Sequence, residues 1–308
     1  MTNKRFNDLT TYYENLFGTK VFKISLNGGF SCPNKDGKIS YDGCSFCSKL
    51  GSGDFAGDKD EPLSIQFKKI KEMMETKWNG KYIAYFQANT NTYASIDVLK
   101  EKYEEALKLD PNIIGLSIST RPDSISEECY EYLKELNKRT FLTIELGLQT
   151  IHDEINKELN RGHDFNCFKD CVYKLSNLGI KNIVVHIIDG LPGETKKEML
   201  ETVNELNKFP ISGIKIHLLH IMKDTKMGED YLKKPFKTLT LPEYVDIAVS
   251  QIEILRPDII IHRLTGDSPK ELLIEPMWSL KKFVVLNEID KELRRRNTYQ
   301  GIYYKKES

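Results

Sequence analysis

Two alternating hydrophobic patterns run along the chain. Short, near-continuous apolar segments rich in β-branched and aromatic residues are typical of buried strands, and longer stretches with apolar residues at helical spacing are typical of amphipathic helices. We expect strands at 20–26, 81–87, 113–119, 141–148, 182–188 and 213–219, and helices between them at 63–77, 95–109, 126–138, 164–178 and 194–208.

The alternation of apolar strands with helices predicts a parallel sheet whose faces are both covered. Ser126 and Asp164 directly precede two of the helical stretches, as N-cap residues do. A further strand at 258–263 and a final helix at 280–296 extend the pattern. We therefore expect an α/β fold that is a closed or partly closed β/α barrel of six or more units, in preference to an open doubly wound sheet. In such barrels the reactive groups lie at the C-terminal ends of the strands.

No low-complexity tract and no long Pro/Gly/Ser linker divides the 308 residues. We expect an N-terminal extension over 1–19, a barrel core over 20–225, and a C-terminal extension over 226–308 that caps the barrel. The predicted architecture is thus a partial (β/α)6 barrel with an addition at each end.

Composition restricts the classes of protein to which the chain can belong. The 45 Lys and Arg residues balance 45 Asp and Glu residues, so the formal net charge is zero. A non-specific nucleic-acid binder usually has a basic excess, although a balanced chain can carry a local basic groove. No run approaches the roughly 18 apolar residues of a membrane span, and the polar, aromatic N-terminus lacks the apolar stretch of a secretory signal. We expect a cytoplasmic protein that makes no membrane contact.

The strongest chemical signal is the segment CPNKDGKISYDGCSFC at 32–47, directly after the first expected strand. Cys44 and Cys47 form a CxxC pair, a spacing that lets two thiolates reach one metal centre. Turn-forming residues bring Cys32 back toward this pair. In a cytosolic chain, clustered thiols indicate metal or redox chemistry in preference to disulfides. The remaining cysteines lie in expected helices and are interpreted as packing residues: Cys129, Cys167 and Cys171.

The number of thiols limits the kind of metal centre. A structural zinc site is normally closed by four ligands, and the first histidine of the chain is His152, far from the cysteines. An iron-sulfur cubane normally has four cysteines, so three would leave one iron open to another ligand. Two interpretations follow: an iron-sulfur cluster with a reactive iron, or a zinc half-site in a non-enzymatic RNA-binding module.

Cys32, Cys44 and Cys47 after the first strand of a β/α barrel resemble the cluster ligands of radical S-adenosylmethionine (SAM) enzymes. The usual CxxxCxxC is absent. The wider spacing is similar to that of relatives of the Elongator catalytic subunit and of the coproporphyrinogen oxidase-like group, and the string at 32–47 most resembles the YtqA/YhcC family. The resemblance implies a 4Fe-4S cluster on these cysteines, SAM on its open iron, and a 5'-deoxyadenosyl radical. It also implies an electron donor such as flavodoxin or ferredoxin.

Companion motifs at later strand ends carry the expected SAM contacts. The segment QANTNTY at 87–93 stands where many superfamily members have Gly-Gly-Glu, and it offers amide and hydroxyl groups instead. Even spacing places two polar residues of the fourth strand on one side of the sheet. The resemblance implies that these two residues contact SAM and that an arginine holds the SAM carboxylate. It also implies that the adenine of SAM packs against a glycine-proline turn. The expected cofactor-binding residues are Gln87, Asn89, Glu145, Gln149, Arg161, Gly190 and Pro192.

Cationic and imidazole side chains at other strand ends are candidates for substrate contact and catalysis. Arg121 stands before Pro122 at the end of the third strand, where a guanidinium group can hold a carboxylate or phosphate through two bonds. His217, His220 and Arg263 would surround the barrel mouth, and histidine can donate or accept a proton near neutral pH. A surface ion pair for Arg121 and core packing for the histidines remain alternatives.

The substrate is inferred from the same resemblance. It implies that the substrate is tRNA. It also implies a reaction at C5 of the wobble uridine, in which a carboxymethylaminomethyl group loses its carboxymethyl part and becomes an aminomethyl group. Arg121, Arg263 or a histidine would then hold the carboxylate. The basic, tyrosine-containing segment RRRNTYQGIYYKK at 294–306 is the expected RNA contact. A radical SAM enzyme that acts on a small metabolite or a tetrapyrrole is the alternative.

Overall fold

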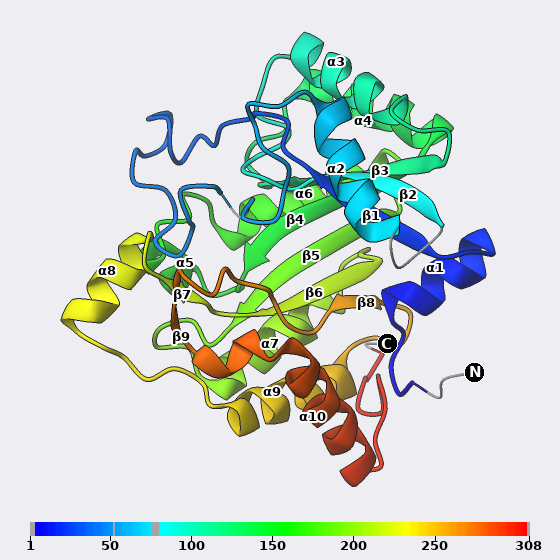
Figure 1. The fold of residues 1–308 in the computed structure, drawn as a ribbon. Helices are drawn as coiled ribbons and strands as arrows, with labels where there is room; N and C mark the ends of the chain where they lie inside the picture. Colours follow the sequence, from blue (N-terminus) through cyan, green and yellow to red (C-terminus); the bar gives the residue numbers. More distant parts are fainter. Residues whose placement is uncertain (1–3, 52, 76–79, 307–308) are drawn as a thin grey trace.

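A computed structural model describes residues 4–51, 53–75 and 80–306. The chain forms a curved parallel sheet with helices on its outer face and long loops gathered at one end (Figure 1). Within the described ranges, no helix combines the length and the apolar character that a membrane crossing requires.

The central sheet contains all the strands that the hydrophobic pattern predicts, and the ends of the first six differ from the prediction by no more than one residue. They are β1 (Val21–Leu26), β2 (Lys81–Phe86), β3 (Ile113–Thr120), β4 (Phe141–Gln149), β5 (Asn182–Asp189), β6 (Gly213–Leu218) and β8 (Ile260–Arg263). Their order in the sheet is the order of this list, and every neighbouring pair is parallel. In the described part of the chain β1 and β8 do not pair with each other, so the barrel is partly closed.

The expected crossover helices are also present: α2 (Leu63–Glu75), α3 (Ile96–Leu107), α4 (Glu127–Arg139), α6 (Phe165–Asn177) and α7 (Lys196–Leu206). α3, α6 and α7 are a little shorter than predicted, α4 is shifted by one residue, and the last two positions expected for α2 lie outside the described residues. Ser126 and Asp164 cap α4 and α6 as predicted, because their side-chain oxygens accept the backbone N–H groups of Cys129 and Cys167. These caps fix where each crossover begins.

Further elements were not predicted. They are α1 (Leu9–Phe17), α5 (Asp153–Glu158), β7 (Ile221–Met222), α8 (Lys226–Lys233), α9 (Leu241–Ile254), β9 (Leu273–Glu275) and the 3-10 turn η1 (Met277–Leu280), while α10 (Lys282–Arg295) is the expected final helix. β8 completes the central sheet although it lies in 226–308, the segment expected to be an extension. The boundary at residue 225 therefore stays a prediction.

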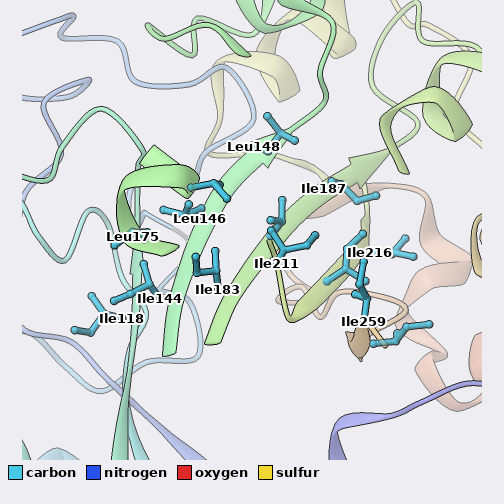
Figure 2. Close-up of a cluster of buried hydrophobic side chains, with 14 of the residues drawn as sticks. Ile118, Ile144, Leu146, Leu148, Leu175, Ile183, Ile187, Ile211, Ile216 and Ile259 are labelled. Atoms are coloured by element: carbon cyan, nitrogen blue, oxygen red, sulfur yellow. The ribbon is translucent and has the colours of Figure 1, made fainter. Parts of the chain in front are cut away.

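The outer face of the sheet is apolar. Alternate strand residues point toward the helices and are fully buried, as Figure 2 shows for Ile144 and Leu146 of β4, Ile183 and Ile187 of β5, and Leu175 of α6. Burial of apolar surface contributes about 25 cal/mol per Å². This layer therefore holds the strands in register.

The inner face differs from the prediction of near-continuous apolar strands. The intervening residues are largely polar, and an internal cavity is lined by Lys23 of β1, Glu145 of β4, His186 of β5 and Lys215 of β6. Parallel strands buried on both faces are normally apolar throughout. Charged side chains inside the barrel therefore indicate a site and not a packed core.

The N-terminal segment covers the end of the barrel at which the strands begin, called here the lower end. Asp8 forms a parallel bridge with Ile261 on β8, and α1 contacts both β1 and β8. Tyr13 of α1 packs its ring edge-on against Phe141, the first residue of β4. α1 thus closes the barrel at the N-terminal ends of the strands, opposite the loops (Figure 1).

The cysteines lie on the long loop 27–62, of which all but residue 52 is described. The backbone N–H of Ser45 donates to the carbonyl oxygen of Leu159 at 2.9 Å. Asn34 Nδ2 donates to the carbonyl oxygen of Asn160 at 2.6 Å, and Asn160 Nδ2 donates to that of Gly43 at 2.7 Å. The polypeptide itself therefore fastens this loop over the C-terminal ends of the strands.

A carboxyl–amide pair is buried between β5 and α9. Gln251 Nε2 donates to Asp189 Oδ1 at 2.7 Å, and the two side chains belong to residues that are 0% and 1% exposed. In the described structure, Asp189 Oδ2 and Gln251 Oε1 have no hydrogen-bond partner. Burial raises the pKa of Asp189 to about 7. A protonated carboxyl group would donate to Gln251 Oε1 and satisfy both atoms.

We expect Asp189→Asn to stabilise the protein at pH 8 relative to the wild type, by about 2 kcal/mol. The amide keeps the acceptor and supplies the missing donor without a proton. Because the folded pKa of Asp189 lies above its ordinary value of 3.8, wild-type stability is full at low pH and is lost as the pH rises through about 7. Urea unfolding at pH 5 and pH 8 measures the effect.

The control for this variant is Asp170→Asn on the exposed side of α6, which is expected to change stability equally at both pH values. Both variants retain Glu194, whose pKa is raised to about 8 by burial and in part by the charge of Asp189, so the Asp189→Asn effect includes this coupling. An Asp189→Asn effect that is the same at pH 5 and pH 8 would show that Asp189 is already ionised in the folded protein.

Candidate active site

A cavity of about 510 Å³ occupies the barrel interior. Cys32, Cys44 and Cys47 line it at the loop end, and Tyr13 of α1 lines it at the lower end. The C-terminal rim of a β/α barrel is where such folds carry their chemistry. The predicted metal ligands therefore lie at the position expected of an active site.

Most of the predicted site residues meet in this one cavity although they are distant in sequence. The four residues expected to contact substrate all line it: Arg121, His217, His220 and Arg263. Five of the seven residues expected to bind the cofactor also line it: Gln87, Asn89, Glu145, Gln149 and Arg161.

Cys44 is surrounded by groups that favour its thiolate. Arg161 Nη1 donates to Cys44 Sγ at 3.2 Å, and Asn34 Nδ2 donates to it at 3.4 Å. Arg121 Nη1 lies 3.9 Å from the same sulfur. Burial alone would raise the pKa of Cys44, but the two guanidinium groups bring it below its ordinary value. The thiolate is the form that binds metal.

The donor set fits a 4Fe-4S cluster. Cys32 and Cys44 are buried, Cys47 is half-buried, and all three thiols are free. The cationic Arg161 and Arg121 offset negative charge at the sulfur end of the cavity. Within the described residues, no three His, Cys, Asp or Glu side chains converge on the position of a single metal ion. The thiolates of a cubane each bind a different iron, so they need to surround a cluster and not to meet at a point.

The guanidinium group of Arg121 is engaged within the protein. Its Nε and Nη2 donate to the two carboxylate oxygens of Asp123 at 2.9 and 2.7 Å, and Nη2 also donates to the carbonyl oxygen of Arg161 at 2.6 Å. The side chain of Arg121 is only 6% exposed. Because Asp123 occupies the guanidinium fork, this geometry does not support the expected contact of Arg121 with a substrate carboxylate, which stays a prediction. Arg121 instead positions Arg161 beside Cys44.

Glu145 lies at the centre of the barrel interior, with its side chain fully buried. Lys23 Nζ and Lys215 Nζ each donate to one of its oxygens at 2.5 Å. Tyr85 Oη donates to Oε2 at 2.9 Å, and His186 Nε2 lies 2.8 Å from the same oxygen. Burial opposes ionisation, yet Lys215 and Lys23 hold the pKa of Glu145 well below its usual range. Both oxygens are engaged within the protein, so this geometry does not support the expected contact with SAM.

The imidazole groups in the cavity are neutral at pH 7. Burial lowers the pKa of both His186 and His220 to about 4. Burial, His186 and Arg263 hold the pKa of His217 well below its ordinary value. These histidines therefore offer hydrogen bonds, whereas positive charge in the interior comes from lysine and arginine.

Two expected cofactor residues have unusual backbone conformations. Asn89, just after β2, has φ of 59°, and Gln149, the last residue of β4, has φ of 75°. Such conformations are uncommon outside glycine and cluster at ligand sites. The backbone N–H of Asn89 donates to the carbonyl oxygen of Gly51 in the cysteine loop at 2.7 Å. Both residues, with Gln87, line the cavity wall nearest the cysteines, and their contact with SAM stays a prediction.

The glycine-proline turn after β5 does not line this cavity. Gly190 packs beside Leu239, since a Cβ placed on it would lie 2.9 Å from the Leu239 side chain. Pro192 lines a separate cavity of about 260 Å³ between α5 and α8. From β5, His186 and Ile188 line the main cavity. The structure therefore gives no support to the predicted contact of Gly190 and Pro192 with adenine.

Two important residues were not predicted. Lys23 is the one lysine of β1, VFKISL, and Lys215 is the one lysine of β6, GIKIHL, and both strands are otherwise largely apolar. A lone charge in a buried strand needs a partner, so this signal was present in the sequence. Which carboxylate they share became clear only from the arrangement of the strands.

Comparison with known proteins agrees with this geometry. Residues 34–206 match the family model of the Radical SAM superfamily, and residues 211–295 match that of the Radical_SAM C-terminal domain. The chain is 49% identical to YtqA of Bacillus subtilis over 306 residues, which covers 99% of this chain and 94% of YtqA.

More distant relatives also match. The chain is 26% identical over 194 residues to the tRNA uridine(34) acetyltransferase of Methanocaldococcus infernus, which covers 58% of this chain and 35% of that protein. The solved structure of archaeal Elp3 from the same organism superposes with a TM-score of 0.66 at 18% identity, over 91% of this chain and 64% of that one. The structural likeness shows a shared fold.

The superfamily model spans more than half of the chain, and its matched segment contains Cys44, Cys47 and four of the strands that line the cavity, β2 to β5. A 4Fe-4S cluster and SAM are the cofactors of such proteins, and the cysteine loop fits the first of them. The chain belongs to the radical SAM superfamily and is an enzyme of that superfamily.

Proposed function

We propose that this radical SAM enzyme modifies the C5 side chain of the wobble uridine in tRNA. In the proposed reaction, a carboxymethylaminomethyl group loses its carboxymethyl part and becomes aminomethyl. The observation that carries the proposal is the cavity, which has the cluster cysteines at one end and the cations Lys215 and Arg263 along its wall. A narrow, charged interior suits a small anionic substituent that enters from the rim.

A relationship to RNA-modifying proteins supports the choice of tRNA. The relative named tRNA uridine(34) acetyltransferase aligns with 58% of this chain. A small metabolite or a tetrapyrrole is the alternative substrate. An electron donor of the flavodoxin or ferredoxin class completes the proposed system.

The residues of this chain have separate tasks in the proposed reaction. When bound, the cluster and SAM supply a radical that removes a hydrogen atom from an unactivated C–H bond. Arg161 and Arg121 neutralise charge beside Cys44, and the amides of Gln87 and Asn89 offer hydrogen bonds to polar groups of SAM. α1 packs against β1 and β8 at the lower end of the barrel, which limits the access of water from that end.

Mass spectrometry of tRNA nucleosides from cells with and without the gene tests the proposal. Without the gene, carboxymethylaminomethyl uridine is expected to accumulate and aminomethyl uridine to disappear. Wild-type protein is expected to restore the profile, and the Cys47→Ala variant is expected not to. An unchanged nucleoside profile, together with no saturable tRNA binding at physiological salt, would favour a small-molecule substrate.

The C-terminal basic segment is the proposed RNA contact, but only part of it is available. Arg296 is 19% exposed and is held by Asp246 at 2.6 Å and Glu253 at 3.2 Å. Reversing its charge would disrupt this packing, so Arg296 is withdrawn from the predicted contact. Arg294 and Arg295 have side chains that are 60% and 72% exposed.

We expect the double variant Arg294→Glu/Arg295→Glu to weaken tRNA binding by about tenfold at 0.15 M salt, because it removes two phosphate contacts. Filter binding across a salt series measures the affinity and its slope. The control is Lys134→Glu/Lys138→Glu on α4, for which we expect unchanged affinity. If the two variants bind tRNA with the same affinity, the RNA contact lies elsewhere on the protein.

A further inference from the structure

The barrel interior holds more positive than negative charge. Lys23 and Lys215 both contact Glu145, whose single negative charge balances only one of them. The carboxylate nearest to Arg263 is Asp267 at 3.8 Å, and Asp267 lies closer to Lys282, at 2.7 Å. Among the described residues, these carboxylates are too few for the cations that face them. An uncompensated buried charge costs several kcal/mol, so its retention points to a ligand of opposite charge.

The strands place the surplus cations side by side. Lys215 of β6 is in register with His186 of β5 and with Arg263 of β8, so the three side chains project from neighbouring strands. His217 follows two residues after Lys215, on the same side of β6. All four residues line the cavity. The Lys215 side chain is 8% exposed and that of Arg263 is 37% exposed, so Lys215 lies deeper and Arg263 is more accessible.

We propose that Lys215 and Arg263, with the imidazole of His217 beside them, form a subsite for a carboxylate group of the substrate. This inference rests on the proposed function and identifies the group by which that substrate is recognised. Lys215 supplies a point charge, and the guanidinium group of Arg263 supplies two parallel N–H donors that match a carboxylate. Lys23 and Glu145 act as positioning residues, because Glu145 holds Lys215 Nζ at 2.5 Å.

The electrostatics of the subsite agree with this assignment. Burial and the charges of Lys23 and Arg263 lower the pKa of Lys215 to about 7, against the opposing effect of Glu145. An arriving anion would favour the ammonium form and relieve the repulsion among the cations. Two further arginines line the cavity, and both are already engaged: Arg121 is paired with Asp123, and Arg161 donates to Cys44 Sγ and to the carbonyl oxygen of Gly147.

Calorimetric binding of free nucleosides to the reconstituted holoenzyme with SAM tests the subsite. We expect the wild type to bind carboxymethylaminomethyl uridine about tenfold more tightly than aminomethyl uridine. Lys215→Met is expected to remove this preference, and Lys215→Arg is expected to retain most of it. Lys215→Met leaves the Lys23–Glu145 pair intact, so the variant is expected to fold, which its melting temperature checks. Lys196→Met, at an exposed ion pair with Asp246, is the matched control and is expected to keep the wild-type preference.

A phosphate of the RNA backbone has the same charge as a carboxylate, and the experiment separates the two sources. If inorganic phosphate displaces neither nucleoside, the result supports a carboxylate subsite. Phosphate that competes with both nucleosides in the wild type, but not in Lys215→Met, would assign the cations to the backbone and overturn the proposal. An equal preference in the wild type and Lys215→Met would also overturn it. The tRNA nucleoside profile tests the proposed function independently. Failure of the carboxylate subsite is therefore distinguishable from failure of the proposed function.

Discussion

Replacing Glu145 with glutamine is expected to lower the free energy of unfolding by about 3–5 kcal/mol. The fully buried Glu145 side chain accepts from Lys23 and Lys215, each at 2.5 Å. Without its charge, two ammonium groups remain inside the barrel with no carboxylate between them. One of them must lose its proton or draw water into the interior, and either change is costly. Urea unfolding at pH 7 measures the loss.

The matched control is Glu104→Gln, which removes the acidic partner of Arg139 at an exposed ion pair. We expect that substitution to cost less than about 1 kcal/mol, because solvent screens both charges. Lys215→Met is informative in the same assay, since it leaves one cation for one anion and is expected to be far less damaging. A Glu145→Gln protein as stable as the wild type would mean that the interior charges are hydrated.

Cys44→Ala is expected to abolish cluster binding and, with it, all SAM cleavage. Cys44 receives hydrogen bonds from Arg161 and Asn34, and the charges of Arg161 and Arg121 bring the pKa of this buried thiol below its ordinary value, so its thiolate is prepared to bind iron. With two cysteines left, the cluster loses an anchor and has a second open iron. Iron and sulfide content after anaerobic reconstitution, together with the visible absorbance, measure the loss.

Cys167→Ala provides the control for general effects of removing a thiol. Cys167 is half-buried on α6, and its thiol does not line the cavity. We expect this variant to bind iron and sulfide as the wild type does. Full iron content in Cys44→Ala would assign the cluster to a different set of ligands and would remove the basis of the proposed chemistry.

The order of strands and crossover helices was predictable because each strand is apolar on its helix-facing side and each helix has one apolar face. α9 was missed although Thr240 and Glu243 form a capping box and Pro242 stands in its first turn, a signal that a sequence carries by itself. α1 and α5 span only 9 and 6 residues, too few for a clear helical period. The closure of the barrel by α1 depends on contacts with Phe141 that no local pattern encodes.

The candidate site was predictable where chemistry is concentrated in one segment, as at Cys32, Cys44 and Cys47. It was less predictable where a side chain has to find its partner in space. Arg121 looked available in the sequence, yet Asp123, only two residues later, occupies its guanidinium group. Lys215 finds its carboxylate 70 positions earlier in the chain. A pair such as Lys215 and Glu145 depends on which strands are neighbours and on their register. Both are properties of the assembled sheet.

The attachment of the cysteine loop to the barrel determines what remains of the site after the cluster is lost. Asn34, Ser45 and Asn160 attach the loop to the barrel through bonds made by the polypeptide alone. The apoprotein should therefore keep its shape when oxygen destroys the inorganic centre. We therefore expect iron and sulfide to restore the cluster on this preformed loop without refolding of the chain.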